Sequence, residues 1–171
     1  LGRMRSLATR VIFPKDILVY SAVLANLPEF LISMVLTTLV ALLSGAPVSW
    51  ALVALPLVVL MQVLLVLWVS LLLSMIYVFV RDIEHLFDVG MRILFFGTPI
   101  IYSLDALSPT LRVIALLNPL TQVIGFSRTI LLAGQWPPIG QMLGFLAINA
   151  GVVLAAIAGF RRAEPALLER L

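Results

Sequence analysis

The stretch Trp50–Val80, "WALVALPLVVLMQVLLVLWVSLLLSMIYVFV", decides the class of this protein, because it contains no charged residue. A helix needs about 20 mainly apolar residues to cross the roughly 30 Å hydrocarbon core of a bilayer. Trp50–Val80 exceeds that length, so a helix here can tilt or extend beyond the bilayer. The stretch therefore predicts a transmembrane helix.

The composition of the whole chain supports the same interpretation. Hydrophobic residues make up 63% of the 171 residues and the mean hydropathy is +1.19, whereas soluble domains contain about 45–50% apolar residues. The formal net charge of +3 is spread along the chain, so no basic stripe indicates binding of nucleic acid. There is no cysteine, which excludes disulfides. We therefore expect an all-α, polytopic integral membrane protein.

Two further apolar runs flank the first. Ile17–Leu43 is interrupted only by Asn26, Pro28 and Glu29, and Gln141–Phe160 has no charge. The uncharged segment "SGAPVS" (Ser44–Ser49) predicts a turn between the first two spans. The segment "RDIEHLFD" (Arg81–Asp88) is densely charged and is expected to lie in water or against protein.

The segment "FFGTPIIYS" (Phe95–Ser103) is apolar but contains Gly97 and Pro99. Its apolar surroundings extend only over Ile93–Tyr102, and ten helical residues rise roughly 15 Å, half the thickness of the core. Such a broken element survives at membrane depth only where protein or a water-filled cavity covers it. We predict a short third span here.

The following residues 103–135 predict two short helices that dip back from the external face, with Asn118-Pro119 as the turn between them. The expected fold is thus about four membrane helices, the third one short, plus two re-entrant helices. In this arrangement Phe95–Tyr102 is a short helix and the re-entrant pair forms an outer gate.

The basic residues predict the orientation, since cytoplasmic loops carry an excess of Lys and Arg. With both termini in the cytoplasm, only Arg112 and Arg128 lie outside. The aromatic residues agree, with Trp50 and Trp136 at outer ends and Tyr20 and Tyr77 toward inner ends. The basic residues on the inside are Arg3, Arg5, Arg10, Lys15, Arg81, Arg92, Arg161, Arg162 and Arg170.

Four motifs in register carry a resemblance to a family. They are "FPKDIL" (Phe13–Leu18), "YVFVRDI" (Tyr77–Ile83), "FFGTPIIY" (Phe95–Tyr102) and "LNPLTQVIGFSRTILLAG" (Leu117–Gly134). Their order and spacing resemble the permease subunits of ABC-2 type transporters, over roughly Arg10 to Phe160. They look most like the branch that exports polysaccharides and polyol phosphates, namely O-antigen, capsule and teichoic acid.

The resemblance implies a permease in the cytoplasmic membrane that moves a lipid-linked polysaccharide or a related cell-envelope polymer. It implies a permease homodimer with membrane lipid around it and a separate ABC ATPase subunit. The pattern GxxxxGK[ST] is absent from the sequence, so we expect ATP in the partner and no cofactor on this chain. Residues 1–171 are expected to form one permease domain that lacks the family's N-terminal spans. The alternatives are a drug or lipid efflux permease of the same superfamily and a non-transporting membrane scaffold subunit.

Charged residues at the cytoplasmic ends are candidates for coupling to the ATPase. The alternative for the segment after the second span is a solvated loop, and for Pro14 a plain helix start. A metal site at His85 with Glu84 and Asp88 is a weaker interpretation, because one histidine with carboxylates on a charged turn is not a specific pattern. The coupling candidates are Pro14, Lys15, Asp16, Arg81, Asp82 and Glu84.

Three other charged residues have a functional and a structural interpretation. Glu29 is an intramembrane carboxylate, which by default suggests function, although snorkelling from a span that begins near Leu24 is the alternative. Arg112 and Arg128 flank the Asn118-Pro119 break. They could bind an anionic head group, such as the pyrophosphate of a lipid-linked glycan, or act as interfacial anchors.

The remaining candidates concern the path. Phe95, Phe96 and Tyr102 could stack on sugars, or could simply pack against other side chains. No arrangement of Ser, His and Asp and no pair of carboxylates suggests catalysis, so we expect a transport protein and not an enzyme. The path and gate candidates are Phe95, Phe96, Gly97, Pro99, Tyr102, Asn118 and Pro119.

Overall fold

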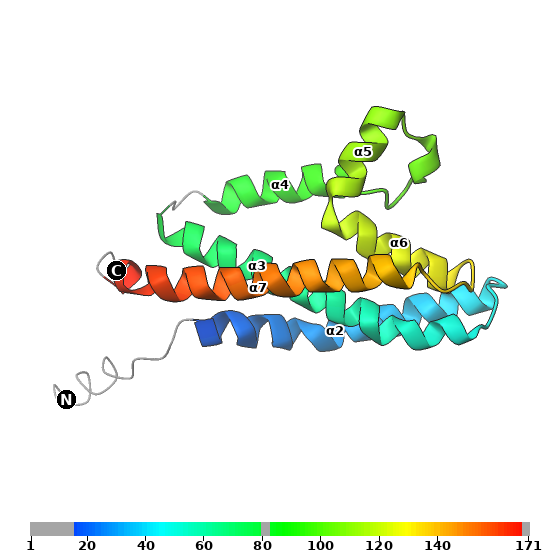
Figure 1. Cartoon of the computed structure of the whole chain (residues 1–171), viewed down its shortest axis with the longest axis horizontal. Coiled ribbons are helices and arrows are strands. Elements are labelled where there is room, and N and C mark those ends of the chain that lie inside the picture. Colours follow the sequence, from blue (N-terminus) through cyan, green and yellow to red (C-terminus); the bar gives the residue numbers. More distant parts are fainter. Residues whose placement is uncertain (1–15, 80–82, 169–171) are drawn as a thin grey trace.

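The computed structural model describes residues 16–79 and 83–168, with the backbone alone for residues 16, 78–79, 83–84 and 163–168. These residues form helices and no strand. Three helices dominate: α2 (Asp16–Leu43), α3 (Leu55–Phe79) and α7 (Ile139–Leu168). They lie side by side along the long axis of the molecule, with α3 and α7 parallel to each other and antiparallel to α2 (Figure 1). The structure thus confirms an all-α architecture with long apolar helices.

Each of the three predicted long spans exists, with small shifts at the ends. α2 runs through Pro28 without a break and begins at Asp16. The run from Trp50 begins as a 3-10 helix, η1 (Trp50–Ala54). The Ser49 hydroxyl caps it by accepting a hydrogen bond from the Ala51 N–H. The apolar segments long enough to cross a membrane are Ile17–Leu43, Trp50–Tyr77 and Ile139–Arg162.

The helix α3 is the centre of the bundle. It packs most extensively on α7, and also on α2 and on α6 (Pro119–Leu131). The main core joins η1 and α3 to α6 and α7, and a smaller cluster of Leu71, Ala156 and Phe160 lies further along. Trp68 Nε1 donates a hydrogen bond of 3.0 Å to Asn149 Oδ1 between α3 and α7. The main core consists of Ala51, Ala54, Val58, Met61, Leu65, Val123, Phe126, Ile130 and Met142.

The third span, predicted over Ile93–Tyr102, begins earlier than expected. The residues from Ile83 to Asp88 form the first turns of α4 (Ile83–Gly97). No proline interrupts this stretch, and acidic residues are favourable near a helix N-terminus. The 15 residues of α4 rise roughly 22 Å, still short of a bilayer core.

The helix predicted over Ile93–Tyr102 also ends earlier than expected. α4 stops at Gly97, and Thr98–Tyr102 has no helical structure. The residue before a proline is biased against helical backbone angles, so Thr98 cannot readily continue the helix into Pro99. Phe95–Tyr102 is therefore the last turn of α4 followed by a loop, and not a helix of its own.

The predicted pair of short helices is present. A short 3-10 helix, η2 (Leu104–Ala106), precedes α5 (Pro109–Leu117), and α6 follows after a single residue, Asn118. The axes of α5 and α6 differ by 96° at this break. Each helix begins with proline, which is pre-set for the first helical turn.

One difference concerns the C-terminal end of the chain. The last span was predicted to end at Phe160, but α7 continues as a helix to Leu168. The end of the bundle where α2 begins, α3 ends and α7 ends is called the charged end below. The opposite end, with residues 44–49 and 132–138, is called the turn end (Figure 1).

The two turns at the turn end fit closely against each other. Gly134 has a φ of +61°, and a Cβ built on it would lie 2.7 Å from Pro47 Cγ. Only glycine combines this backbone conformation with this close approach. The contact places the start of α7 and the end of α6 directly beside the α2–α3 turn.

Candidate functional site

The loop after α4 is joined to the α5–α6 break by buried polar contacts. Thr98 is 1% exposed, and Pro99 is also buried. Asn118 Nδ2 donates to Thr98 Oγ1 at 2.8 Å, and Thr98 Oγ1 donates to the Leu94 carbonyl at 2.6 Å. The side chain of Asn118 thereby connects the last turn of α4 to the vertex of the helix pair.

Asn118 also stabilises the break itself. Its Oδ1 accepts a hydrogen bond of 3.0 Å from the backbone N–H of Leu120, which makes Asn118 the N-cap of α6. Gln122 Nε2 donates to the Leu116 carbonyl at 3.0 Å, across the break. The sharp angle is thus fixed by side chains on both sides of it, and not by proline alone.

Arg128 forms a second connection to the same loop. From the last turns of α6, its Nη2 donates to the Ile100 carbonyl at 2.6 Å and its Nη1 to the Tyr102 carbonyl at 3.5 Å. The planar guanidinium suits two acceptors in this way. Arg128, proposed from the sequence as a head-group ligand, therefore has two donors engaged with the protein backbone.

The contacts of Thr98–Tyr102 with Asn118 and Arg128 are called the latch below. Tyr102 completes it, since its hydroxyl donates to the Phe96 carbonyl at 2.8 Å and satisfies one of the free carbonyls at the end of α4. The sequence did not point to Thr98. Its position directly before Pro99 and four residues after Leu94 was the available signal, because a threonine there can bond back to the helix.

Arg112 lies outside the latch. Its Nη1 is 3.3 Å from Asp105 Oδ1, and both side chains are well exposed, at 51% and 83%. An exposed pair of this kind contributes about 0–1 kcal/mol. Arg112 and Arg128 therefore differ in their surroundings, although both were predicted as head-group ligands or interfacial anchors.

The helix α4 stands apart from the bundle except at its end. Between His85 and Gly97 every side chain is exposed apart from the half-buried Leu94, and α4 has no extensive contact with another described helix. Figure 1 shows α4 running from the charged end toward the α5–α6 pair along the edge of the bundle. Phe95 and Phe96, two path candidates, are exposed and pack edge to face at 5.5 Å.

The residues of α4 separate into two kinds of surface. His85, Asp88 and Arg92 recur at steps of three or four residues and share one face. Leu86, Ile93 and Gly97 lie on another face, and around Gly97 no atom comes within 4 Å of where a Cβ would be. The first face is charged and the second mainly apolar, so α4 is amphipathic over most of its length.

Most coupling candidates lie outside the described residues. Pro14, Lys15, Arg81 and Asp82 fall there, while Asp16 and Glu84 are described only by their backbone, at the first residues of α2 and α4. Both elements begin at the charged end (Figure 1). In the described part of the chain, no group of three His, Asp or Glu side chains could hold a metal ion.

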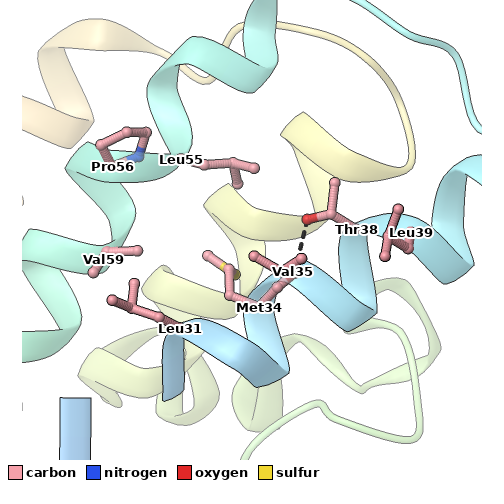
Figure 2. Close-up of a pocket in the computed structure, with 8 residues that line it drawn as sticks. All are labelled: Leu31, Met34, Val35, Thr38, Leu39, Leu55, Pro56 and Val59. Atoms are coloured by element: carbon pink, nitrogen blue, oxygen red, sulfur yellow. Dashed lines mark hydrogen bonds between the residues drawn. The ribbon is translucent and has the colours of Figure 1, made fainter. Parts of the chain in front are cut away.

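A groove lies between α2 and α3 toward the turn end. It has a volume of about 410 Å³ and is lined by Leu31, Met34, Val35, Thr38, Leu39, Leu55, Pro56 and Val59. Figure 2 shows these side chains around the gap and the Thr38 hydroxyl bonded to the Met34 carbonyl, at 2.8 Å. No polar group in the lining is free to bind a head group, so the groove is not part of the candidate site.

Glu29 lies near the middle of α2. Because α2 is helical from Asp16 onward, Glu29 is roughly 18 Å along the helix from Ile17 and roughly 21 Å from Leu43. The helix is longer than a bilayer core is thick, so both interpretations of Glu29, an intramembrane carboxylate and a side chain that snorkels to an interface near Leu24, stay predictions. Glu29 is exposed on the surface of α2.

These features define a multi-pass α-helical membrane protein with a bent pair of short helices at one end. The ABC-2 type transporter family matches residues 4–132 of the chain, which is most of its length, so the chain belongs to the ABC-2 type transporter family. The resemblance inferred from the four motifs is thus confirmed.

Three relatives carry the same description. The chain is 30% identical over 164 residues to the O-antigen export system permease protein RfbA of Myxococcus xanthus, covering 94% of this chain and 63% of the relative. It is 26% identical over 161 residues to an RfbA of Klebsiella pneumoniae, covering 91% and 62%. A second Klebsiella pneumoniae RfbA is 27% identical over 126 residues, covering 73% and 49%. The chain thus spans less than two thirds of the length of these relatives.

Proposed function

We propose that this chain is the membrane-spanning permease of an ATP-driven exporter that moves a lipid-linked polysaccharide or a related envelope polymer across the cytoplasmic membrane. The observation that carries the proposal is the family membership together with relatives that are all O-antigen export permeases. The drug-efflux and scaffold alternatives have no observation in their favour.

The proposal includes partners. Two copies of the permease form the path, and a separate ABC ATPase at the charged end supplies the energy, so the chain itself is a transporter and not an enzyme. The exposed, amphipathic surface of α4 supports a location beside the path, because its charged face with Asp88 and Arg92 needs water or protein as a neighbour. The first residues of α2 and α4, with Asp16 and Glu84, are in position to receive the movement of the ATPase.

The α5–α6 pair would act as the outer gate. From the vertex at Asn118, α6 runs toward the turn end, while α5 stands away from the bundle at a bend of 96° (Figure 1). The vertex is connected to α4 through Thr98. A displacement of α4 that starts at the charged end would therefore reach the gate through the latch.

The proposal is tested by deleting the gene in the organism that produces the protein. We expect surface polymer to be lost and lipid-linked polymer to accumulate in the cytoplasmic leaflet, because synthesis continues without export. Both quantities can be measured by immunoblotting of intact and lysed cells, with complementation as the control. If surface polymer is unchanged and the deletion strain becomes sensitive to a small amphiphilic compound, the chain would instead be a drug or lipid efflux permease.

A further inference from the structure

A small pocket between α2 and α3 has one polar side chain on each of its two walls. Asn26 comes from α2 and Gln62 from α3, and both lie inside segments that are long and apolar enough to cross a membrane. The pocket has a volume of about 100 Å³ and is called the amide pocket below. Its other lining residues are apolar, namely Val23, Leu27, Phe30, Val63 and Val66.

The two side-chain amides of this pocket keep unused hydrogen-bonding groups. Asn26 Nδ2 donates to the Ala22 carbonyl at 2.8 Å, and its Oδ1 remains as an acceptor within the described part of the chain. The half-buried Gln62 side chain forms no hydrogen bond with any residue of 16–79 or 83–168. The amide pocket therefore offers both donors and acceptors to an occupant.

The polar contact between α3 and α7 is of a different kind. Asn149 is 3% exposed, its Oδ1 accepts from Trp68 Nε1 at 3.0 Å, and its Nδ2 donates to the Phe145 carbonyl at 2.9 Å. Both groups of this amide are bonded directly to the protein, so this contact needs no further molecule. Asn26 and Gln62 share a pocket without such a direct bond in the described chain.

Hydrocarbon is an unfavourable occupant of the amide pocket. A lipid chain offers no hydrogen bond, so amide groups beside it would stay unpaired at a cost in free energy. The larger groove between the same two helices differs in this respect, because its hydroxyl, that of Thr38, is already bonded to the Met34 carbonyl. Only the amide pocket of these two hollows requires a polar occupant.

Water fits both the chemistry and the size of the amide pocket. A water molecule can donate and accept, and enclosed waters typically make about three hydrogen bonds to polar groups that lack other partners. Because one water occupies about 30 Å³ of liquid volume, the pocket has room for about three. A few water molecules can therefore connect the wall of α3 to the wall of α2.

We infer that the amide pocket is a water-binding site, in which bound water links the Gln62 amide to Asn26 Oδ1. The contact between α2 and α3 is then hydrated at this level, whereas the contact between α3 and α7 is direct. The inference concerns residues within the described chain, and it depends neither on the cargo nor on the proposed transport function.

Hydroxyl-radical footprinting by X-ray radiolysis tests the inference, because radicals formed from a bound water oxidise the side chains next to it. The permease is irradiated in lipid nanodiscs, and oxidation of Phe30, which lines the amide pocket, is measured by mass spectrometry. Phe126 is the control, since it is 5% exposed and belongs to the main core. We expect Phe30 to be oxidised several times faster than Phe126. Equally slow oxidation of the two rings would overturn the inference.

A substitution in the pocket tests whether Gln62 holds the water. Gln62→Leu should lower the oxidation of Phe30 by roughly three- to fifteen-fold, the range that corresponds to losing one hydrogen bond between membrane helices. Leucine suits an apolar span, so membrane abundance should stay normal. Thr38→Val is the matched control, because it removes a polar group from the other groove between α2 and α3; it should leave the oxidation of Phe30 unchanged. Oxidation of Phe30 that persists in Gln62→Leu, or that falls equally in Thr38→Val, would contradict the inference.

Discussion

Replacing Arg128 by glutamine is expected to lower export per permease molecule by roughly tenfold while membrane abundance stays near normal. Hydrogen bonds from a charged group contribute about 1.5–3 kcal/mol, and the half-buried position of Arg128 favours the lower value. A loss of about 1.4 kcal/mol changes an equilibrium constant tenfold. Without the contacts to Ile100 and Tyr102, the loop after α4 is held to α6 less tightly.

Arg112→Gln is the matched control, because Arg112 is also an arginine near the Asn118 break but forms an ion pair with the exposed Asp105. Export should change by less than about fivefold, as an exposed pair contributes about 0–1 kcal/mol. Spin labels at Ile101 and Leu132 provide a second readout. Their distance distribution should broaden in Arg128→Gln and not in Arg112→Gln. An equal loss of export in both variants would favour head-group binding over the latch.

The second large effect is expected for Gly97→Leu at the end of α4. No atom of the described chain lies within 4 Å of a Cβ at Gly97, so leucine fits the fold of this chain. If a second copy or the cargo approaches Gly97 closely, the added side chain causes overpacking of about 1–3 kcal/mol. Export should then fall by roughly five- to hundred-fold at normal abundance, measured as surface polymer per permease.

Gly144→Leu on α7 is the control for this variant. Gly144 is likewise an exposed glycine of a membrane helix with no atom within 4 Å of a Cβ, but it lies on α7, which has no part in the latch. Its substitution should leave export within twofold. Normal export by both variants would show that α4 does not line the path at Gly97. A lower membrane abundance of both variants, with normal export per permease, would show that leucine only disturbs packing in the membrane.

The sequence predicted the long helices well because their signal is simple. An uncharged apolar run such as Trp50–Val80 has few structural alternatives, and a proline such as Pro28 is tolerated within α2 in spite of its missing N–H. The α5–α6 break was also predictable, since Asn118 is a good N-cap and Pro119 a good first residue of a helix.

The boundaries of α4 and the latch could not be predicted in the same way. Charged residues such as Asp88 are compatible with a loop and with the first turns of a helix, and only the chain that follows decides between them. The bond from Asn118 to Thr98 spans 20 positions, and that of Arg128 to Ile100 spans 28. Such contacts depend on how α4 and α6 are placed in space, which hydropathy and spacing do not determine.

The central claim is that the α5–α6 pair re-enters the membrane, so that both of its ends lie on the external side. Single-cysteine labelling tests this claim most directly. The chain has no native cysteine, so cysteines can be introduced at Ser44, Asp105, Trp136 and Arg161 one at a time and treated with an impermeant maleimide. The account predicts labelling of Ser44→Cys, Asp105→Cys and Trp136→Cys in intact cells and of Arg161→Cys only after permeabilisation. Labelling of Asp105→Cys and Trp136→Cys from opposite sides would make α5 and α6 one broken span and would contradict the re-entrant gate.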